Sequence, residues 1–322
     1  MFRSCRPLFR KSFVNRFVFC LLACVLLSGR ELRSETPLEE VVLPSDTITM
    51  IKPDSSQIRP YEWYRSRYLY MGDWGKAFTV ESEFMWPAGA TRPDSSSLTP
   101  FQFWVSHMPL WHYGRGVSSV RKGAVYAPSQ ISRAVRFPWR SSELTDRAIP
   151  LQILAEFLLM GNRRDQFRPI TKASDTLDYG RFLKSSFSYG PRENIVFQNA
   201  SSRSDTITEF NSFFNLCAVN TTYRSLTLNA DSIPLEAIMP GDVIVAQNES
   251  GTSGTAHVVL VRLNRPNGES FFLIATGCEF ACDFHVPLFN AGRREFPWLT
   301  LEQLTALGAE YPRRGAYRLR VP

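Results

Sequence analysis

The chain has 322 residues, a hydrophobic fraction of 44% and a formal net charge of +7 at neutral pH. The hydrophobic fraction is sufficient for a sizeable core, in one large domain or two smaller ones. Five positive charges lie within the first 29 residues, and without them the net charge falls from +7 to +2. The basic balance therefore does not indicate a nucleic-acid-binding protein.

Residues 1–29 have the organisation of a secretory signal peptide. Five basic residues and no acidic one accompany an apolar run of 11 residues, Phe17 to Leu27. A helix that spans a bilayer needs about 20 apolar residues, so this run predicts a removable signal. The alternative, a buried amino-terminal helix, would not need a basic flank of one sign. We expect an exported protein of the periplasm or cell envelope.

The segment Leu21-Leu22-Ala23-Cys24 has the form of a bacterial lipobox, which makes Cys24 a candidate lipidation site. Lipidation would tether the protein to a membrane. The apolar run before Cys24 has only seven residues and continues through Val25 to Leu27, which favours cleavage near Gly29. Both outcomes remain open, and no other membrane contact is expected because no later apolar run is long enough to span a bilayer.

The next two segments differ in composition. Residues 30–60 are polar and contain four prolines, which predicts a tether or extended arm. Residues 61–86 contain nine aromatic side chains and are expected to form an aromatic-rich extension packed on the core. A platform for stacking sugars is the alternative. We expect residues 61–322 to form a single α+β domain with its core at about 84–300.

Four segments have helical signals. The apolar spacing within Pro100–Met108 follows a plausible cap, Thr99, and a proline at the first helical position. An amphipathic helix over Leu151–Leu159 ends at Gly161 and has Pro150 in its first turn. Further helices are expected at Ile207–Leu216, capped by Asp205, and at Leu299–Leu307, capped by Thr300.

The final third of the chain is rich in β-strand signals. Val243–Val245, Val258–Leu263 and Ser270–Ala275 are three β-rich runs, and Asn267-Gly268 predicts a hairpin between the last two. Tyr317–Val321 can supply another strand. Shorter strands are expected at Val117–Val120, Ala124–Tyr126 and Val135–Trp139. Helices packed on an antiparallel sheet make an α+β fold the predicted class.

Three cysteines remain after the predicted signal: Cys217, Cys278 and Cys282. Export permits disulfides, and an odd number leaves at least one thiol free or paired between chains. Cys278 and Cys282 are four residues apart and could form a small disulfide ring. His107 and His112 have the wrong spacing for a helical metal pair, and the chain has only four histidines, so we expect no metal and no cofactor.

Six motifs follow one another along the chain. They are Trp86-Pro87-x-Gly89-x-x-Arg92, Phe101-x-x-Trp104-x-x-x-Met108-Pro109-Leu110, Leu154-Ala155-Glu156-Phe157-Leu158, Met239-Pro240-Gly241-Asp242-Val243, Ala256-His257-Val258-Val259 and Phe272-Leu273-Ile274-Ala275. In this order they resemble a bacterial exported family described as domain of unknown function 4846. The resemblance covers roughly residues 84–300 and has no established activity attached to it. The strand layout of that family is similar to papain-like amidases of the cell-wall hydrolase type.

The resemblance implies a cysteine at the start of the Leu-rich helix, and here Asp146 stands at or near that position. Ala256 replaces the glycine expected before the histidine, and Thr276 replaces a glutamine expected after the third strand. His257 is in the place of the general base. Asp146 could cap the helix or pair with His257, and His257 could simply be a histidine satisfied by a backbone carbonyl.

Two other cysteines could supply the thiol that is absent from the start of the Leu-rich helix. Cys278 follows the third β-run and could pair with His257, whereas Cys217 lies near a helix end, where the dipole would raise its pKa. The expected function is a catalytically degenerate papain-like domain that binds an unidentified ligand or protein at the cell envelope. The alternatives are a cysteine-type hydrolase or amidase that uses His257 as base, and a structural envelope component.

Overall fold

Antiparallel strands, mostly from the last third of the chain, pair into one large sheet against which the helices pack. The computed structural model describes residues 50–51, 79–111, 114–135, 141–191, 193–199, 202–289, 294 and 296–322, all within the compact unit Asp46–Pro322. The predicted signal peptide, Cys24, His112 and most of the segments 30–60 and 61–86 lie outside the described residues. The arrangement confirms the α+β class.

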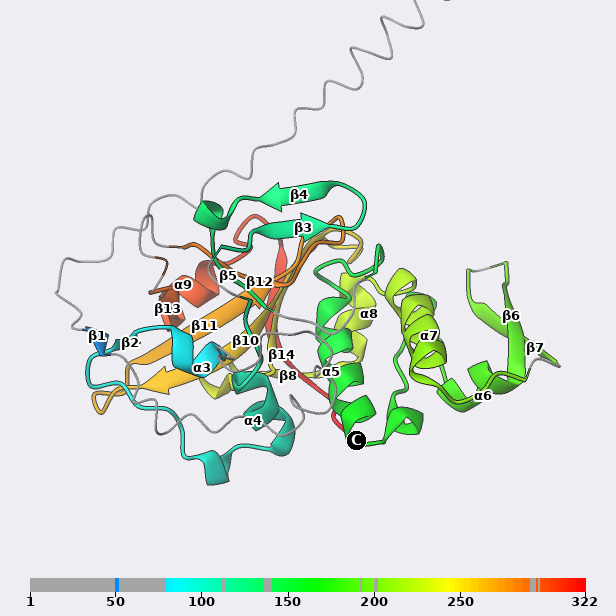
Figure 1. Ribbon diagram of the computed structural model, residues 1–322, viewed down its shortest axis with the longest axis horizontal. Coiled ribbons are helices and arrows are strands. Elements are labelled where there is room, and N and C mark those ends of the chain that lie inside the picture. The colour runs from blue at the N-terminus through cyan, green and yellow to red at the C-terminus, as the bar shows by residue number, and fades with distance from the viewer. Residues whose placement is uncertain are drawn as a thin grey trace, which may run out of the picture. The chain divides into compact units, whose positions relative to one another are not determined.

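The central sheet has eight strands among the described residues, in the order β5-β12-β11-β10-β9-β14-β8, with β13 paired to β11 outside this path (Figure 1). All of these pairs are antiparallel. The strands are Ile131–Ala134 (β5), Ala230–Ile233 (β8), Val243–Gln247 (β9), Gly254–Asn264 (β10), Ser270–Thr276 (β11), His285–Pro287 (β12), Trp298–Thr300 (β13) and Arg313–Leu319 (β14).

The three β-rich runs predicted from the sequence are confirmed as β9, β10 and β11. Asn267 and Gly268 make the turn between β10 and β11, as predicted, because Gly268 has a φ of +89° that favours glycine. The Asn267 side chain accepts the Glu269 N–H at 3.1 Å within the same turn. The last strand, β14, starts and ends earlier than the predicted Tyr317–Val321.

Helix α5 spans Ile149–Met160 and ends at Gly161, with Pro150 in its first turn, as predicted. Its N-cap is Ala148, and the Thr145 carbonyl accepts the N–H groups of residues 148 and 149. Asp146 therefore lies two residues before the cap, and the prediction that it caps the helix is wrong. The turn that the Thr145 carbonyl closes before α5 directs the Asp146 carboxylate towards α8 and β10.

Side-chain caps set the starts of the other principal helices. Thr99 and Gln102 form a capping box at α4, Pro100–Ser106. The cap of α7 is Thr206 and not the predicted Asp205, whose carboxylate accepts the Tyr179 hydroxyl at 2.9 Å instead. The remaining bounds are Val80–Glu83 (α3), Tyr179–Lys184 (α6), Ile207–Val219 (α7), Tyr223–Leu228 (α8) and Leu301–Ala306 (α9, capped by Thr300 as predicted).

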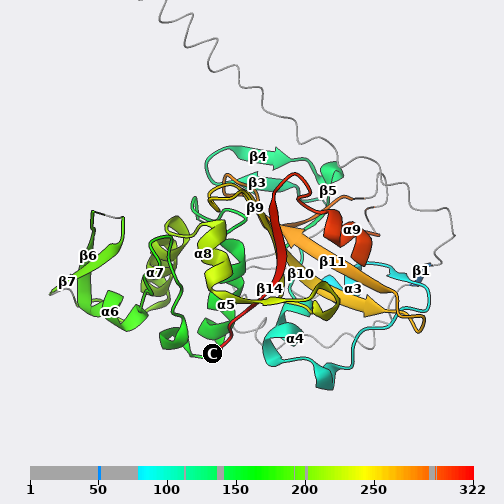
Figure 2. The same cartoon turned by 180° about the vertical axis from the view of Figure 1, so that it is seen from behind.

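Small two-stranded sheets accompany the central one. Figure 2 shows the β6–β7 hairpin beside α6, away from the central sheet. Residues 50–51, the described part of the predicted tether, form β1 and pair with β2. The bounds are Met50–Ile51 (β1), Trp86–Pro87 (β2), Val117–Ser119 (β3), Gly123–Tyr126 (β4), Ser185–Tyr189 (β6) and Ile195–Asn199 (β7). Of the predicted strand Val135–Trp139 only Val135 is described, and it forms a bridge with Leu110.

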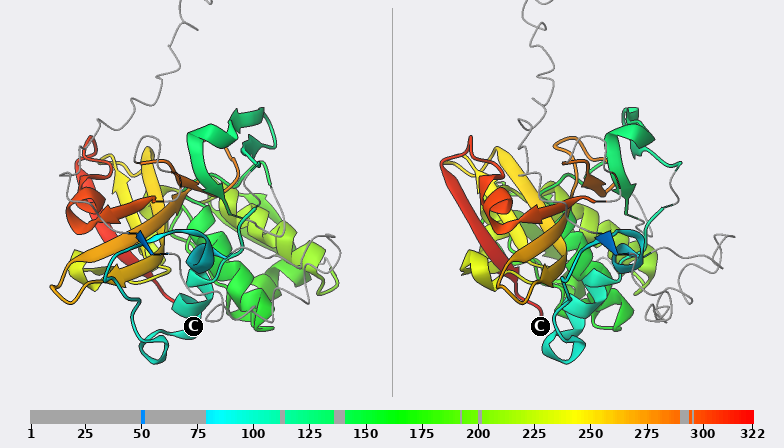
Figure 3. Two further views of the ribbon diagram at one scale, coloured as in Figure 1. Left: turned by 60° about the vertical axis from the view of Figure 1, so that its left-hand side comes forward. Right: turned by 90° about the vertical axis from the view of Figure 1, so that its left-hand side faces the viewer.

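The two faces of the sheet are covered by different elements. Helices α4, α5 and α8 pack on one face, where Ala256 and Val258 of β10 belong to their cluster, which we call the helix-side cluster. On the other face, Ile244 and Val259 pack with Leu304 of α9 in the α9-side cluster. Figure 3 shows α9 and α5 on opposite sides of the sheet.

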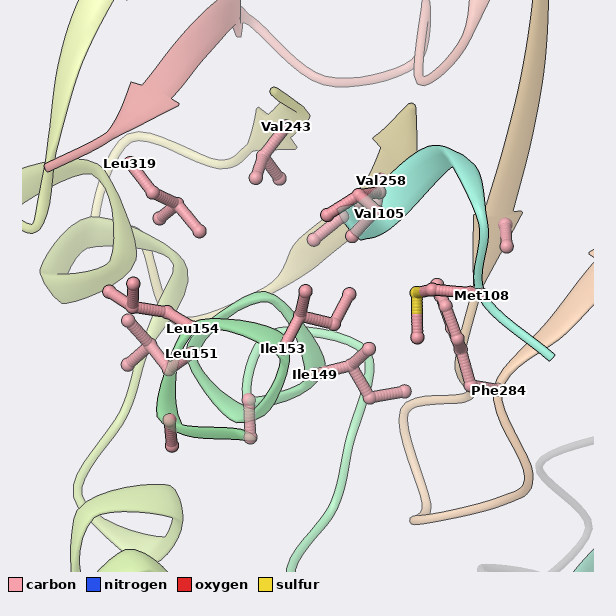
Figure 4. Packing of buried hydrophobic residues seen from close by; sticks show 14 of the residues in the cluster. Val105, Met108, Ile149, Leu151, Ile153, Leu154, Val243, Val258, Phe284 and Leu319 are labelled. Atoms are coloured by element: carbon pink, nitrogen blue, oxygen red, sulfur yellow. The ribbon is translucent and has the colours of Figure 1, made fainter. Parts of the chain in front are cut away.

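Close packing of branched side chains holds α5 against the sheet. Figure 4 shows Ile153 and Leu154 of α5 with Val243 and Val258 of the sheet and Val105 of α4. All five side chains are at most 6% exposed. Burying one such side chain contributes about 1.5–3 kcal/mol relative to leaving it in water, so this contact fixes where the ends of α5 lie.

Candidate functional site

Asp146, at the position where the resemblance implies a nucleophile, is fixed at the approach to α5. Its backbone N–H donates to the Cys278 carbonyl at 3.0 Å, just beyond the end of β11. Its carboxylate accepts the Ala256 N–H of β10 at 3.2 Å. A Cβ on Gly277 would lie 3.0 Å from the Asp146 Cα and 2.4 Å from the Ile149 side chain. Glycine at 277 therefore permits the close approach.

The Asp146 carboxylate is buried and well supplied with donors. The Tyr223 hydroxyl lies 2.9 and 2.8 Å from its two oxygens, and the Arg147 N–H donates to Oδ1 at 2.8 Å. Burial raises the pKa of Asp146 to about 6, although the hydrogen bonds from Tyr223, Arg147 and Ala256 act in the opposite direction. We call these four residues, which join α5, α8 and β10, the Asp146 cluster.

The same cluster ties down the start of α8. Tyr223 is 1% exposed, and burial together with the nearby Asp146 carboxylate raises the pKa of its hydroxyl. The Arg147 guanidinium donates from Nε to the Thr221 carbonyl at 2.9 Å. The hydroxyl is therefore held as a hydrogen-bond donor and is not poised to lose its proton. The arrangement suits a structural role better than proton transfer.

His257 lies next to this cluster along β10 but its side chain is on the other face. It pairs in register with Ile244 and Thr276, and Ile244 belongs to the α9-side cluster. Side chains alternate along a strand, so the neighbour that faces Asp146 is Ala256 and not His257. No interaction with His257 contributes to the pKa of Asp146, and none with Asp146 contributes to that of His257. The expected pairing of the two side chains is therefore wrong.

The imidazole of His257 is held in its neutral form. Its Nδ1 atom is buried and has no hydrogen-bond partner among the described residues. Burial, and secondarily the proximity of His285, lowers the pKa of His257 to about 4. In a catalytic site, a third polar group accepts a hydrogen bond from the histidine ring and fixes its tautomer. No described residue does this at Nδ1 of His257.

Thr276 and His285 continue the row that His257 begins. Thr276 pairs with His257 on one side and with His285 on the other, across β10, β11 and β12. The Thr276 hydroxyl donates to the Ala256 carbonyl at 2.9 Å. His285 Nδ1 lies 2.9 Å from the Asp283 carbonyl, and its ring is 5.4 Å from that of Tyr126. Thr276 thus serves the backbone of β10 and does not orient an imidazole.

Neither candidate thiol is available as a nucleophile. Cys278 forms a disulfide with Cys282, so the pairing of a Cys278 thiolate with His257 is wrong, whereas the predicted disulfide ring is confirmed. Cys217 is free and buried on α7, and burial raises its pKa well above the ordinary value. A thiolate-imidazole pair is therefore absent from the described residues.

Metal and membrane sites receive no support from the described residues. No three His, Cys, Asp or Glu side chains among them lie close enough together to hold a metal ion. His107 is buried, with Nδ1 2.7 Å from the Phe103 carbonyl, which is a structural arrangement. Within the same residues, no helix combines the length and the apolar character of a bilayer span.

The structure thus brings Asp146, Ala256 and Thr276 together but separates the Asp146 carboxylate from the His257 ring. Tyr223 and Arg147 are the residues of the cluster that the sequence did not indicate. A tyrosine just after a Thr-Thr pair carries no pattern that predicts a partner elsewhere in the chain. Comparisons with protein-family models, with curated proteins and with solved structures found no match to this chain.

Proposed function

We propose that this chain is an exported envelope protein whose α+β domain acts by binding, on a papain-like core that has no catalytic pair. The observation that carries this proposal is the state of Asp146. The residue at the expected nucleophile position is a buried carboxyl engaged with Tyr223, Arg147 and Ala256. A carboxylate held in this way is a poor nucleophile towards an amide.

Two further observations support the proposal. The His257 side chain lies on the face opposite α5 and is half-buried, and desolvation lowers its pKa to about 4, which favours the neutral form. The thiols that could replace the missing nucleophile are a disulfide, at Cys278, and a buried group of raised pKa, at Cys217. The order of the strands β9, β10 and β11 is similar to papain-like amidases, which is an analogy of fold.

Thiol labelling mapped residue by residue tests this proposal. The folded protein and a His257→Ala variant are treated with iodoacetamide at neutral pH, and the modification of Cys217, Cys278 and Cys282 is measured by mass spectrometry. We expect negligible and equal labelling in both proteins. Rapid labelling of one cysteine that is lost in the His257→Ala variant would establish an activated thiol and overturn the binding function.

Substrate turnover and processing are measured on the same two proteins. Purified cell-wall peptides are incubated with each, and we expect no product from either. Product formation that depends on His257 would contradict the proposal.

Export is tested by mass spectrometry of the mature amino terminus. A terminus near Arg30 or a lipid on Cys24 would support export. An intact Met1 in secreting cells would contradict it.

A further inference from the structure

A pocket with a volume of about 360 Å³ lies away from the Asp146 cluster, at the far end of α5. Four segments meet there: the start of α4, the end of α5, the Pro240–Asp242 turn before β9, and the end of β14 with the residues that follow it. Figures 1 and 2 both show the carboxyl end of the chain beside α4 and α5. This volume is at the lower end of the range for small-molecule sites.

The walls of the pocket are mainly apolar. Phe101 and Phe157 make an edge-to-face contact with ring centroids 5.3 Å apart. Gly241 has a φ of +87°, and a Cβ there would lie 2.7 Å from the Phe101 ring, so only glycine fits the turn beside this ring. The other apolar lining residues are Pro100, Pro240, Leu319, Val321 and Pro322.

Two arginines and one acidic side chain line the pocket. Arg318 donates to both oxygens of Asp242, at 2.9 and 2.7 Å, and this pair is self-contained. Arg163 is the second arginine, and no carboxylate side chain pairs with it among the described residues.

Arg163 presents an unused edge of its guanidinium. Nη1 donates at 3.1 Å to a main-chain oxygen of Pro322, the last residue of the sequence, whereas Nε and Nη2 have no hydrogen-bond partner among the described residues. The group lies 5.1 Å from the centre of the Phe157 ring. A Cβ on Gly161 would be 3.0 Å from Nε, so the glycine leaves this edge uncovered. The parallel Nε–H and Nη2–H donors match the two oxygens of a carboxylate.

We propose that this pocket binds a small amphipathic carboxylate, with its apolar body against Phe101 and Phe157 and its carboxylate on the Nε and Nη2 atoms of Arg163. The inference deepens the proposed binding function by naming a ligand class, and it rests on that function. The buried Gln102 side chain lines the same pocket, and its Oε1 is already used in the α4 capping box. Its amide nitrogen makes no hydrogen bond to a described residue and is a second donor for the ligand.

The test uses two acids and their uncharged amides as probes. Binding of 3-phenylpropanoate, decanoate, 3-phenylpropanamide and decanamide to the full chain is measured by isothermal titration calorimetry at low salt. We expect at least one acid to bind about tenfold or more tightly than its amide, because a hydrogen bond to a charged group is stronger than one to a neutral group. Equal affinity of acid and amide in both pairs, or no binding by any probe, would overturn the proposal.

Three variants locate the site. Arg163→Met removes the charge but keeps an apolar stem, and should weaken acid binding about tenfold while leaving the amide unchanged. Arg164→Met is the matched control, because Arg164 pairs with Asp205 at 3.0 Å and does not line the pocket. Val321→Trp fills the pocket from its exposed side and should abolish binding of both probes. Acid binding that survives Arg163→Met and Val321→Trp would place the ligand elsewhere and overturn the assignment.

Gly161→Ala provides a subtler probe of the same contact. The added methyl group displaces the Nε edge without removing the charge, so acid affinity should fall while thermal unfolding stays close to wild type. Failure here is distinguishable from failure of the proposed function. If the probes bind and His257-dependent cleavage is also found, the pocket assignment holds and the proposed binding function is wrong. If no probe binds and no cleavage is found, the pocket assignment is wrong and the proposed binding function is not contradicted.

Discussion

The two ends of α5 have opposite character. At its start, the carboxylate of Asp146 is buried and takes hydrogen bonds from three residues on three elements. At its end, the Arg163 guanidinium faces a pocket with two donor atoms that no described residue uses. Polar groups that are already satisfied hold a fold together, whereas unused donors beside apolar walls are available to a ligand.

This difference between the two ends of α5 changes where a ligand site is expected in the proposed papain-like core. Analogy directs attention to the start of the helix and to the histidine on the neighbouring strand. In this chain the histidine lies on the other face of the sheet from that helix start. The capacity for recognition is concentrated about one helix length away, where the Pro240–Asp242 turn meets α4.

The largest effect is expected from Asp146→Ala. The change leaves the Tyr223 hydroxyl and the Ala256 N–H buried without their acceptor, and each unsatisfied group costs about 1–3 kcal/mol. We expect the free energy of unfolding, measured by urea denaturation at pH 5, to fall by about 4 kcal/mol. Asp165→Ala, at an exposed position, is the control. A loss of stability no larger than that of the control would contradict a structural role for the cluster.

A pH effect of similar size is expected from His257. Its pKa is about 4 in the folded protein, against an ordinary value of 6.5, so the unfolded chain takes up its proton first as the pH falls. The contribution of His257 to stability therefore falls by about 3 kcal/mol between pH 6.5 and pH 4, at 1.36 kcal/mol per pKa unit. The difference in unfolding free energy between wild type and His257→Gln should change by that amount over this range. A constant difference would mean that the ring is not buried in its neutral form.

Asp146 should act with the opposite sign over an overlapping range. Its pKa is raised from 3.8 to about 6, so the folded protein keeps the proton that the unfolded chain releases. This contribution is full below pH 3.8 and is lost as the pH rises through 6, by about 3 kcal/mol. The difference in unfolding free energy between wild type and Asp146→Asn, measured in a series of denaturation curves, should show that decline. If wild type and variant show parallel dependence on pH, the carboxyl is not desolvated as described.

A smaller effect is expected from the disulfide after β11. The disulfide between Cys278 and Cys282 closes a short loop. By restricting the unfolded chain, a loop of this length stabilises the folded protein by about 2 kcal/mol. The Cys278 carbonyl also holds the Asp146 N–H. Replacement of both cysteines by alanine should lower unfolding free energy by about that amount and leave probe binding at Arg163 intact. Loss of probe binding would show that the two ends of α5 are coupled.

Local signals in the sequence predicted much of the fold. Thr99 as a cap, Gly161 as the end of α5 and Asn267-Gly268 as a turn depend on residues only a few positions apart, and all three are confirmed. The Asp205 cap failed because a neighbouring Thr206 competes for the same role, and Asp205 finds a partner in Tyr179. Such competition is decided by contacts with distant segments.

The candidate site was harder to predict because it depends on which face of the sheet each side chain occupies and on contacts between residues far apart in the sequence. The sequence allowed a pairing of Asp146 with His257, but the side of the sheet on which His257 lies is set by the register with Ile244. Tyr223 is 77 residues from Asp146 along the chain, and no local pattern connects them. The pocket combines four separate segments, so Arg163 has no signal in its own neighbourhood.

Calorimetric titration of 3-phenylpropanoate and decanoate into wild type, Arg163→Met and Asp146→Asn measures the contrast between the two ends of α5 most directly. The account predicts about tenfold weaker binding of the acid that wild type binds when Arg163 is changed, and unchanged binding when Asp146 is changed. Loss of affinity in Asp146→Asn with none in Arg163→Met would contradict it and return the site of recognition to the start of the helix.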